Sequence, residues 1–142
     1  MKQKLRDTNN TVLVADDELA CREAARFFLE HYGLPCDCVC NGLEVLKAHQ
    51  NNRYSLLLLD LCMDTMSGIE AAKLVRAREQ AKGLARLPIV AMTGSEEDLE
   101  ECLIAGFDEI ILKPVHLADF GRILEQFIPG FLAKPILSDV AH

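Results

Sequence analysis

Four short runs of consecutive apolar residues recur along the chain. They are Val12 to Ala15, Leu56 to Leu59, Ile89 to Met92 and Ile110 to Leu112. Continuous apolar runs of this length are typical of strands that are buried on both faces, as in parallel sheets. A weaker strand is predicted from Pro35 to Cys40, because a proline is confined to the start of a strand or to an edge strand. The pattern therefore predicts five strands.

The segments between these runs carry apolar residues three or four positions apart, which is the spacing of a helix. Five helices are predicted in this way, and Gly33 is expected to end the first of them. Ser95 followed by Asp98 has the pattern of a helix start, with acidic side chains in the first turn. The apolar positions assigned to these helices are Cys21, Ala24, Ala25, Phe28 and Tyr32; Leu43 and Leu46; Gly68, Ala71, Ala72 and Val75; Leu99, Cys102 and Leu103; and Leu117, Phe120, Ile123, Leu124, Phe127 and Ile128.

Strand and helix alternate five times, which predicts an α/β fold, a doubly wound sandwich around a parallel sheet. We predict one domain over residues 11–128, an N-terminal extension over residues 1–10 and a C-terminal tail or linker over residues 129–142. Four apolar residues of the tail either pack back on the body or begin a linker: Phe131, Leu132, Ile136 and Leu137.

The composition narrows the class of protein. The chain has 142 residues, of which 50% are hydrophobic, and this suits one domain with a proper core. Its 15 Lys and Arg residues against 22 Asp and Glu give a net charge of −7, which argues against a nucleic-acid-binding surface. No apolar stretch approaches the about 20 residues of a membrane span, and the start of the chain lacks the pattern of a signal peptide. The six cysteines are therefore expected to be reduced thiols in the cytoplasm.

Polar residues follow directly after four of the predicted strands. These residues are Asp16 and Asp17, Asp60, Thr93, and Lys113 with Pro114. Because ligands gather at the carboxyl ends of parallel strands, we expect three carboxylates, one hydroxyl and one ammonium at a single site. Carboxylate oxygens suit Mg²⁺, and without a cation their repulsion raises the pKa of at least one of them. A lysine and a hydroxyl suit phosphoryl oxygens, so Asp60 is a candidate nucleophile that forms an aspartyl-phosphate.

Each of these residues also has an ordinary structural interpretation. An aspartate after a strand is usually a turn residue. Two acids can simply begin a helix, where they favour the positive N-terminal end of its dipole. Thr93 can be a helix-entry hydroxyl, and Lys113 can be a solvated lysine near a turn. Their joint occurrence after successive strands favours one shared site.

The same residues resemble the receiver domain of response regulators in two-component phosphorelays. The motifs that carry the resemblance are Asp16-Asp17, Asp60, Thr93-Gly94 and Lys113-Pro114, then Leu61-Cys62-Met63, Met66 and Gly68 after the third strand, and Asn41-Gly42 after the second. The resemblance covers about residues 10–128. It implies a flavodoxin-like sheet of five parallel strands in the order 2-1-3-4-5, flanked by five helices.

The resemblance also implies a function and a metal. Asp60 would accept a phosphoryl group from a histidine kinase or a histidine phosphotransfer protein, which makes the chain a signalling switch and not a conventional enzyme. Asp17, Asp60 and the backbone carbonyl of Cys62 would bind Mg²⁺ (or Mn²⁺) directly, and Asp16 would act through water.

Two further residues carry implied roles, and two positions depart from the family pattern. Lys113 would contact the phosphoryl group, Thr93 would move in to bond it, and the Lys113–Pro114 peptide would be cis. The switch position three residues before the lysine usually holds an aromatic residue, and here it is Ile110. Asp64 stands where a proline is common, and it is expected to add a carboxylate near the metal.

The resemblance places partner binding on the face built from the helix at Leu99, the strand at Ile110 and the helix at Leu117. We expect a monomer or weak dimer, no direct nucleic-acid binding and no membrane insertion. Either the chain is a stand-alone regulator or it is a receiver segment of a larger protein such as a hybrid kinase.

Two rival functions remain at this stage. A haloacid-dehalogenase-type phosphatase also uses an aspartate after an apolar strand, but it needs a second acid two residues later, where this chain has Cys62. A receiver-like adapter binds partners without being phosphorylated. The complete set of acids, threonine and lysine weighs against the adapter, and the missing aromatic at Ile110 weighs for it.

The cysteines allow a further interpretation. Cys36, Cys38 and Cys40 alternate, so on a strand they share one face, and His31 and His49 are near enough in sequence to complete a zinc site. Thiols buried beneath a helix are the favoured interpretation. His116 and His142 are expected at the surface.

Overall fold

The computed structural model describes residues 10–133, and it contains five strands alternating with five α-helices. The strands are β1 (Val12–Ala15), β2 (Cys36–Val39), β3 (Leu56–Asp60), β4 (Ile89–Thr93) and β5 (Glu109–Leu112). The helices are α1 (Leu19–His31), α2 (Gly42–Asn51), α3 (Gly68–Lys82), α4 (Leu99–Ala105) and α5 (Leu117–Phe127), with a 3₁₀ turn, η1 (Glu96–Asp98), before α4. Every predicted strand and helix is present.

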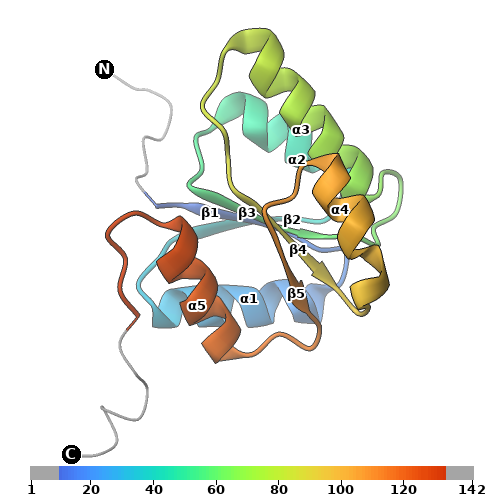
Figure 1. The fold of residues 1–142 in the computed structure, drawn as a ribbon. Coiled ribbons are helices and arrows are strands. Elements are labelled where there is room, and N and C mark those ends of the chain that lie inside the picture. Colours follow the sequence, from blue (N-terminus) through green and yellow to red (C-terminus); the bar gives the residue numbers. More distant parts are fainter. Residues whose placement is uncertain (1–9, 134–142) are drawn as a thin grey trace, which may run out of the picture.

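The five strands form one parallel sheet in the order β2-β1-β3-β4-β5. Helices α2, α3 and α4 cover one face of the sheet, and α1 and α5 cover the other (Figure 1). The predicted fold class, strand order and helix number are therefore confirmed. The predicted N-terminal extension and the end of the tail, with Ile136, Leu137 and His142, lie outside the described residues.

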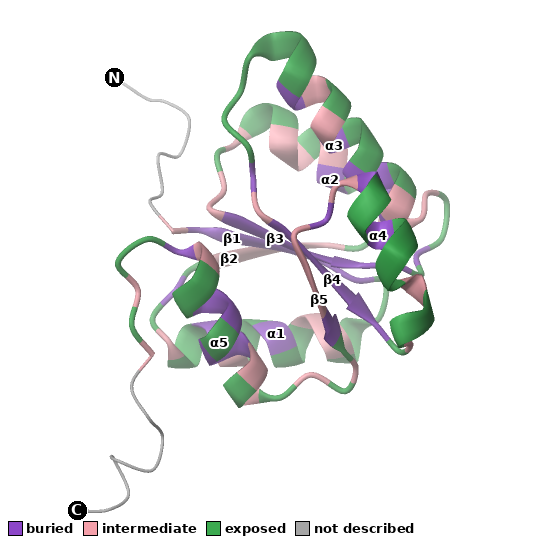
Figure 2. Ribbon diagram, in the orientation of Figure 1, coloured by how far each residue is buried: buried purple, intermediate pink, exposed green. Residues whose placement is uncertain are grey.

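The central strands are buried along their whole length because both faces of the sheet are covered (Figure 2). Side chains alternate between the faces, as the period of a strand requires. Leu13, Leu57 and Leu59 pack toward α2 and α3, whereas Val14 and Leu58 pack toward α1 and α5. The apolar runs thus supply two cores from the same strands.

Local capping explains where several helices begin and end. Asn41 caps α2 by accepting a hydrogen bond from the Glu44 amide, and Ser67 and Glu70 form a reciprocal capping box on α3. Gly83 ends α3 with a φ of 64°, in the left-handed region that glycine adopts without strain.

Two helices turn different faces inward from those that their spacing predicts. Leu99 and Leu103 of α4 are exposed, at 41% and 56%, so the prediction that they face the sheet is wrong. Helix α4 has only seven residues and lies at the β4–β5 edge, where Cys102 and Ala105 suffice to fill the contact. Figure 2 shows its outer side as exposed.

On α1 the inward pair is Ala25 and Leu29, one turn apart. Ala24 is exposed and Leu29 was not assigned to the core, so the predicted stripe on this helix is shifted from the observed one. Ala25 and Leu29 both belong to the buried core on this face of the sheet, and Phe28 and Tyr32 pack against it partly buried.

The cysteines of β2 are less buried than predicted. Cys36 and Cys38 are half-buried against the α1 side of the sheet, and Cys40 is exposed beyond the end of the strand. The lower burial of these cysteines follows from the position of β2, which is an edge strand of the sheet. Cys40 donates to the carboxylate of Glu44, and no cluster of three metal-ligating side chains that includes these thiols occurs among the described residues.

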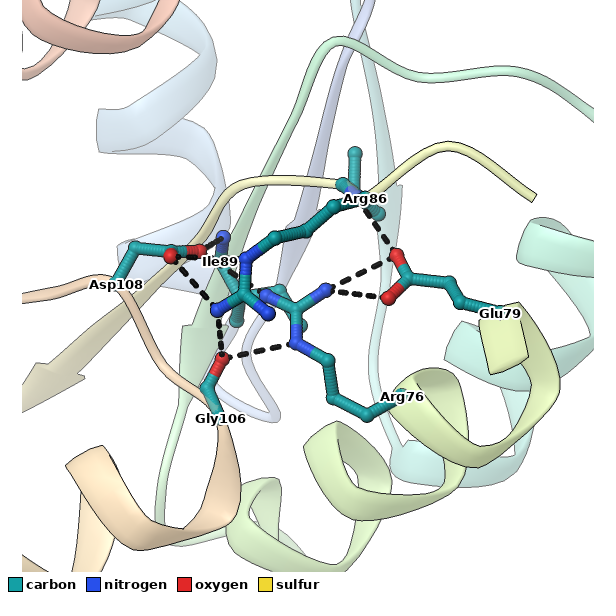
Figure 3. Close-up of polar contacts among 7 residues, drawn as sticks. Arg76, Glu79, Arg86, Ile89, Gly106 and Asp108 are labelled. Carbon is teal, nitrogen blue, oxygen red and sulfur yellow. Dashed lines mark hydrogen bonds and ion pairs between the residues drawn. The ribbon is translucent and has the colours of Figure 1, made fainter. Parts of the chain in front are cut away.

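An ionic network joins the second half of α3 to the segment that leads into β4 and to the loop between α4 and β5 (Figure 3). Arg76 donates to Glu79, to the Gly106 carbonyl and to Asp108. Glu79 also accepts from the Leu87 amide at 2.6 Å. Asp108 in turn accepts from the Ile89 amide, so the network holds the start of β4 beside the loop that leads into β5.

The start of the tail packs back on the body. Phe131 makes an edge contact with Tyr32 of α1, and the Ala133 amide donates to Glu125 of α5. Leu132 is exposed. Within residues 10–133, no helix has both the length and the apolar character needed to cross a membrane.

Candidate functional site

The two central strands carry the acids to the same end of the sheet. Asp16 follows the last residue of β1, and Asp60 is the last residue of β3. Ala15 and Leu59 are partners in the parallel register, so the two aspartates emerge side by side. Asp16 and Asp60 are buried and Asp17 is exposed.

The three aspartates form one acidic cluster. One carboxylate oxygen from each of Asp16, Asp17 and Asp60 lies within 4.8 Å of the other two. Burial raises the pKa of the Asp60 carboxyl, and the neighbouring Asp16 carboxylate raises it further. The convergence and the direction of the pKa shift agree with the expectation from sequence.

Lys113 brings a positive charge from the end of β5 into this cluster. Its Nζ lies 3.0 Å from Asp16 Oδ2 and 3.2 Å from Asp60 Oδ1. Burial alone lowers the pKa of a lysine, but the two carboxylates outweigh it and raise the pKa of Lys113 above its ordinary value. The ammonium is thus held charged beside Asp60. The Lys113–Pro114 peptide bond is cis.

Thr93 ends β4 next to the acidic cluster, and its hydroxyl is buried. The hydroxyl donates to Asp98 at 3.2 Å and accepts from the Ser95 amide at 3.3 Å. Sequence reasoning did not assign Asp98 a part in the site. The only signal for it was an acidic residue at the helix start that follows Thr93.

The loop after β3 is built tightly around Asp60. The Cys62 amide donates to Asp60 Oδ1 at 3.3 Å, and the Gly68 amide donates to the Leu61 carbonyl at 3.1 Å. A Cβ at Gly68 would collide with the backbone of Asp60, so only glycine fits there. Asp64 is exposed and is absent from the acidic cluster, so the structure does not place its carboxylate with the other three.

Ile110 lies on β5, half-buried against the core beneath α2, α3 and α4. Arg22, in the first turn of α1, was not predicted as part of this region. Its guanidinium donates a hydrogen bond of 2.9 Å to the Asp16 carbonyl.

The donor set fits a hard divalent cation. Carboxylate and carbonyl oxygens are the ligands that Mg²⁺ prefers, and a cation would remove the charge conflict that raises the Asp60 pKa. A haloacid-dehalogenase-type site needs an acid two residues after the nucleophile, and that position is Cys62.

The sequence and the fold match known proteins. Residues 12–125 match the family model of the response regulator receiver domain. Probable histidine kinase 1 of Oryza sativa subsp. indica is 31% identical to this chain in an alignment 148 positions long, and the alignment covers 83% of this chain and 15% of that kinase. The chain therefore spans about 15% of the length of this curated relative.

Many solved structures share the fold. The receiver domain of sensor histidine kinase PA1611 from Pseudomonas aeruginosa, with a magnesium ion coordinated in its active-site cleft, superposes with a TM-score of 0.76. It is 27% identical, and the match covers 84% of this chain and 98% of that one. A chain in the complex of the Saccharomyces cerevisiae phosphotransfer protein Ypd1 with the receiver domain of Ssk1 matches with a TM-score of 0.78 and 27% identity, over 88% of this chain and 96% of that one.

The family match covers most of the described residues, and the three acids and Lys113 converge as predicted, with Thr93 at the end of the neighbouring strand β4. This chain belongs to the response regulator receiver domain family.

Proposed function

We propose that the chain is a phosphorylation-dependent switch in which Asp60 accepts a phosphoryl group from a phosphohistidine. The observation that carries the proposal is the carboxylate of Asp60, which lies in the acidic cluster with Lys113 Nζ 3.2 Å from its Oδ1. In phosphoryl transfer the protein mainly positions the reactants and neutralises charge, and these side chains do both.

Each residue of the site has a defined task in this proposal. An oxygen of Asp60 attacks phosphorus, the histidine nitrogen leaves, and an acyl phosphate forms on the Asp60 carboxylate. Lys113 lies close enough to meet a charged oxygen of that group. Thr93 would exchange its hydrogen bond with Asp98 for one with the phosphoryl group, which biases a second conformation.

The cation in the proposal is Mg²⁺ (or Mn²⁺). Asp16, Asp17, Asp60 and the Cys62 backbone carbonyl are the residues that would hold it. When bound, it neutralises charge between the carboxylates and the incoming phosphoryl oxygens. The magnesium ion in the related P. aeruginosa receiver domain supports this assignment.

The test is intact-mass measurement after incubation with Mg²⁺ and acetyl phosphate. We expect one phosphoryl adduct on the wild-type chain and none on Asp60→Asn, while Asp64→Asn, which removes an exposed carboxylate four residues away, keeps the adduct. No adduct from any small donor or histidine kinase would instead favour an adapter that binds without phosphorylation.

The phosphoryl donor is proposed to be a histidine kinase or a histidine phosphotransfer protein. The likeness to part of a plant histidine kinase and to a chain of the yeast Ypd1–Ssk1 complex supports both donors. The same likeness leaves two contexts for the chain, a stand-alone regulator or a receiver segment of a hybrid kinase in the cytoplasm.

We propose that the output face is formed by α4, β5 and α5 and that it binds a protein as a monomer or weak dimer, without contact to nucleic acid. Four large apolar residues of α4 and β5 are exposed there: Leu99, Leu103, Ile104 and Leu112. Ile104→Asp, at the most exposed of them, should weaken partner binding while leaving the phosphoryl adduct unchanged. The exposed Leu43 of α2 provides the control Leu43→Asp, and equal binding by both variants would contradict the assignment.

A further inference from the structure

A cavity lies at the end of the sheet opposite Asp60. It has a volume of about 510 Å³ and lies between the end of α2, the loop that leads into β3, and the end of α3 with the loop after it. Leu56 begins β3 at this end, and Asp60 ends the strand at the other. The cavity is therefore separate from the acidic cluster.

The walls of this cavity are basic although the chain as a whole is acidic. Arg53 and Arg78 carry positive charge there, His49 gains a positive charge when it is protonated, and the remaining lining residues are uncharged at neutral pH. None of the described residues that line it is an aspartate or glutamate, in a chain with a net charge of −7. The local field therefore favours an anion against the sign of the overall charge.

Two buried polar atoms of these side chains are left without partners. His49 Nδ1 and Arg78 Nε make no hydrogen bond to any described residue, and both atoms are shielded from solvent. An Arg Nε–H can only donate, and a buried donor without an acceptor is costly. The two residues belong to α2 and α3, which pack side by side on the same face of the sheet (Figure 1).

We propose that this cavity binds a small molecule that carries a phosphate group. The side chains of Arg78 and His49 line the cavity, and rotation of each turns its shielded donor toward the ligand. The phosphate then accepts from the Nε–H of Arg78 and from the Nδ1–H of protonated His49, and Arg53 adds charge at the exposed rim. The cavity is much larger than a bare phosphate, and Leu84 and Leu87 offer an apolar wall for the rest of the ligand. Nothing in this proposal depends on phosphorylation of Asp60.

Proton uptake by His49 accompanies binding in this arrangement. Burial lowers the pKa of the His49 imidazole, and Arg78 and Arg76 lower it further while Glu79 opposes them. Glu79 is itself held by Arg76 and by the Leu87 amide, and the Tyr54 hydroxyl at the cavity bonds Asp37. A bound anion favours the charged imidazolium, so affinity should rise as the pH falls through the range in which His49 takes up its proton.

The test uses the full chain as Asp60→Asn in EDTA, which removes phosphate binding through a metal at the acidic cluster. Inorganic phosphate and AMP are titrated while the Arg78 Nε–H and His49 ring signals are followed by NMR. Saturable shifts of both signals are expected. Arg78→Gln should weaken binding by about tenfold or more, because a charge-assisted hydrogen bond is lost. Lys82→Gln removes the same charge from an exposed site on the same helix and should leave affinity unchanged.

A second variant and two other anions complete the test. If Arg78→Gln does not fold, His49→Gln serves in its place and should also weaken binding. Sulfate, which keeps its charge over the pH range, should bind more tightly at low pH to the parent chain but not to His49→Gln. Citrate binding without phosphate binding would assign the cavity to carboxylates. That result, or shifts only near Asp60, or no saturable shift at millimolar phosphate, overturns the proposal.

Discussion

The carboxylate of Asp108 binds two arginines that differ in burial. Removal of the buried arginine should therefore lower the free energy of unfolding more than removal of the exposed one. The Arg76 side chain is 13% exposed, and its Nη2 lies 3.0 Å from Asp108. The Arg86 side chain is 57% exposed, and its Nη2 lies 2.8 Å from the same residue. Figure 3 shows both guanidinium groups converging on Asp108.

The two ion pairs should therefore contribute very differently to folding. Arg76→Met leaves the buried Glu79 carboxylate with no cation and removes one donor to Gly106. Loss of one partner of a buried ionic network costs about 3–5 kcal/mol, a large part of the about 5–15 kcal/mol that holds a typical domain together. Arg86→Met removes an exposed pair, for which about 0.2–1 kcal/mol is expected.

Urea unfolding followed by circular dichroism measures both effects as changes in the free energy of unfolding. The urea midpoint should fall far more for Arg76→Met than for Arg86→Met, with the same slope for both. If Arg76→Met does not fold, Arg76→Lys still tests the idea. Lysine keeps the charge but lacks the planar fork that reaches Glu79, Gly106 and Asp108 together, so an intermediate loss is expected.

Equal losses for Arg76→Met and Arg86→Met would refute the reasoning, because burial would then not decide the strength of the pair. A larger loss for Arg86→Met would do so more strongly. A gain in stability for Arg76→Met would show that desolvation of the charges outweighs their attraction in the native protein.

Two further predictions concern the acidic site. Gly68→Ala should destabilise the fold by about 1–3 kcal/mol in urea unfolding, because its Cβ meets the Asp60 backbone, whereas Gly94→Ala, with open space around it, should cost much less. Equal losses would contradict this. In EDTA, Asp60→Asn should raise the urea midpoint at neutral pH, because burial and Asp16 raise the folded pKa of Asp60 and make its ionised form unfavourable. The wild-type chain should lose this part of its stability as the pH rises through that pKa, and an unchanged or lower midpoint for the variant would contradict the prediction.

The local sequence determined the strands and helices, and with them the acidic site at the carboxyl ends of the strands. Continuous apolar runs are stable only when both sheet faces are covered, so Leu56 to Leu59 predicted a central strand and thereby the position of Asp60 at its end. Parallel strands end at one edge, so the convergence of Asp16, Asp60 and Lys113 followed from the order of the elements alone.

Only the tertiary structure decided which side of a helix faces inward and which distant groups meet. The spacing of Leu99 and Leu103 predicted a buried stripe, but a short helix at the edge of the sheet has too little surface beneath it to cover both. The contact of Arg76 with Asp108 and the cavity between His49 and Arg78 join residues that no local pattern relates. Periodicity is a property of one segment, whereas burial depends on where the neighbouring segments lie, and that is settled only when the layers pack.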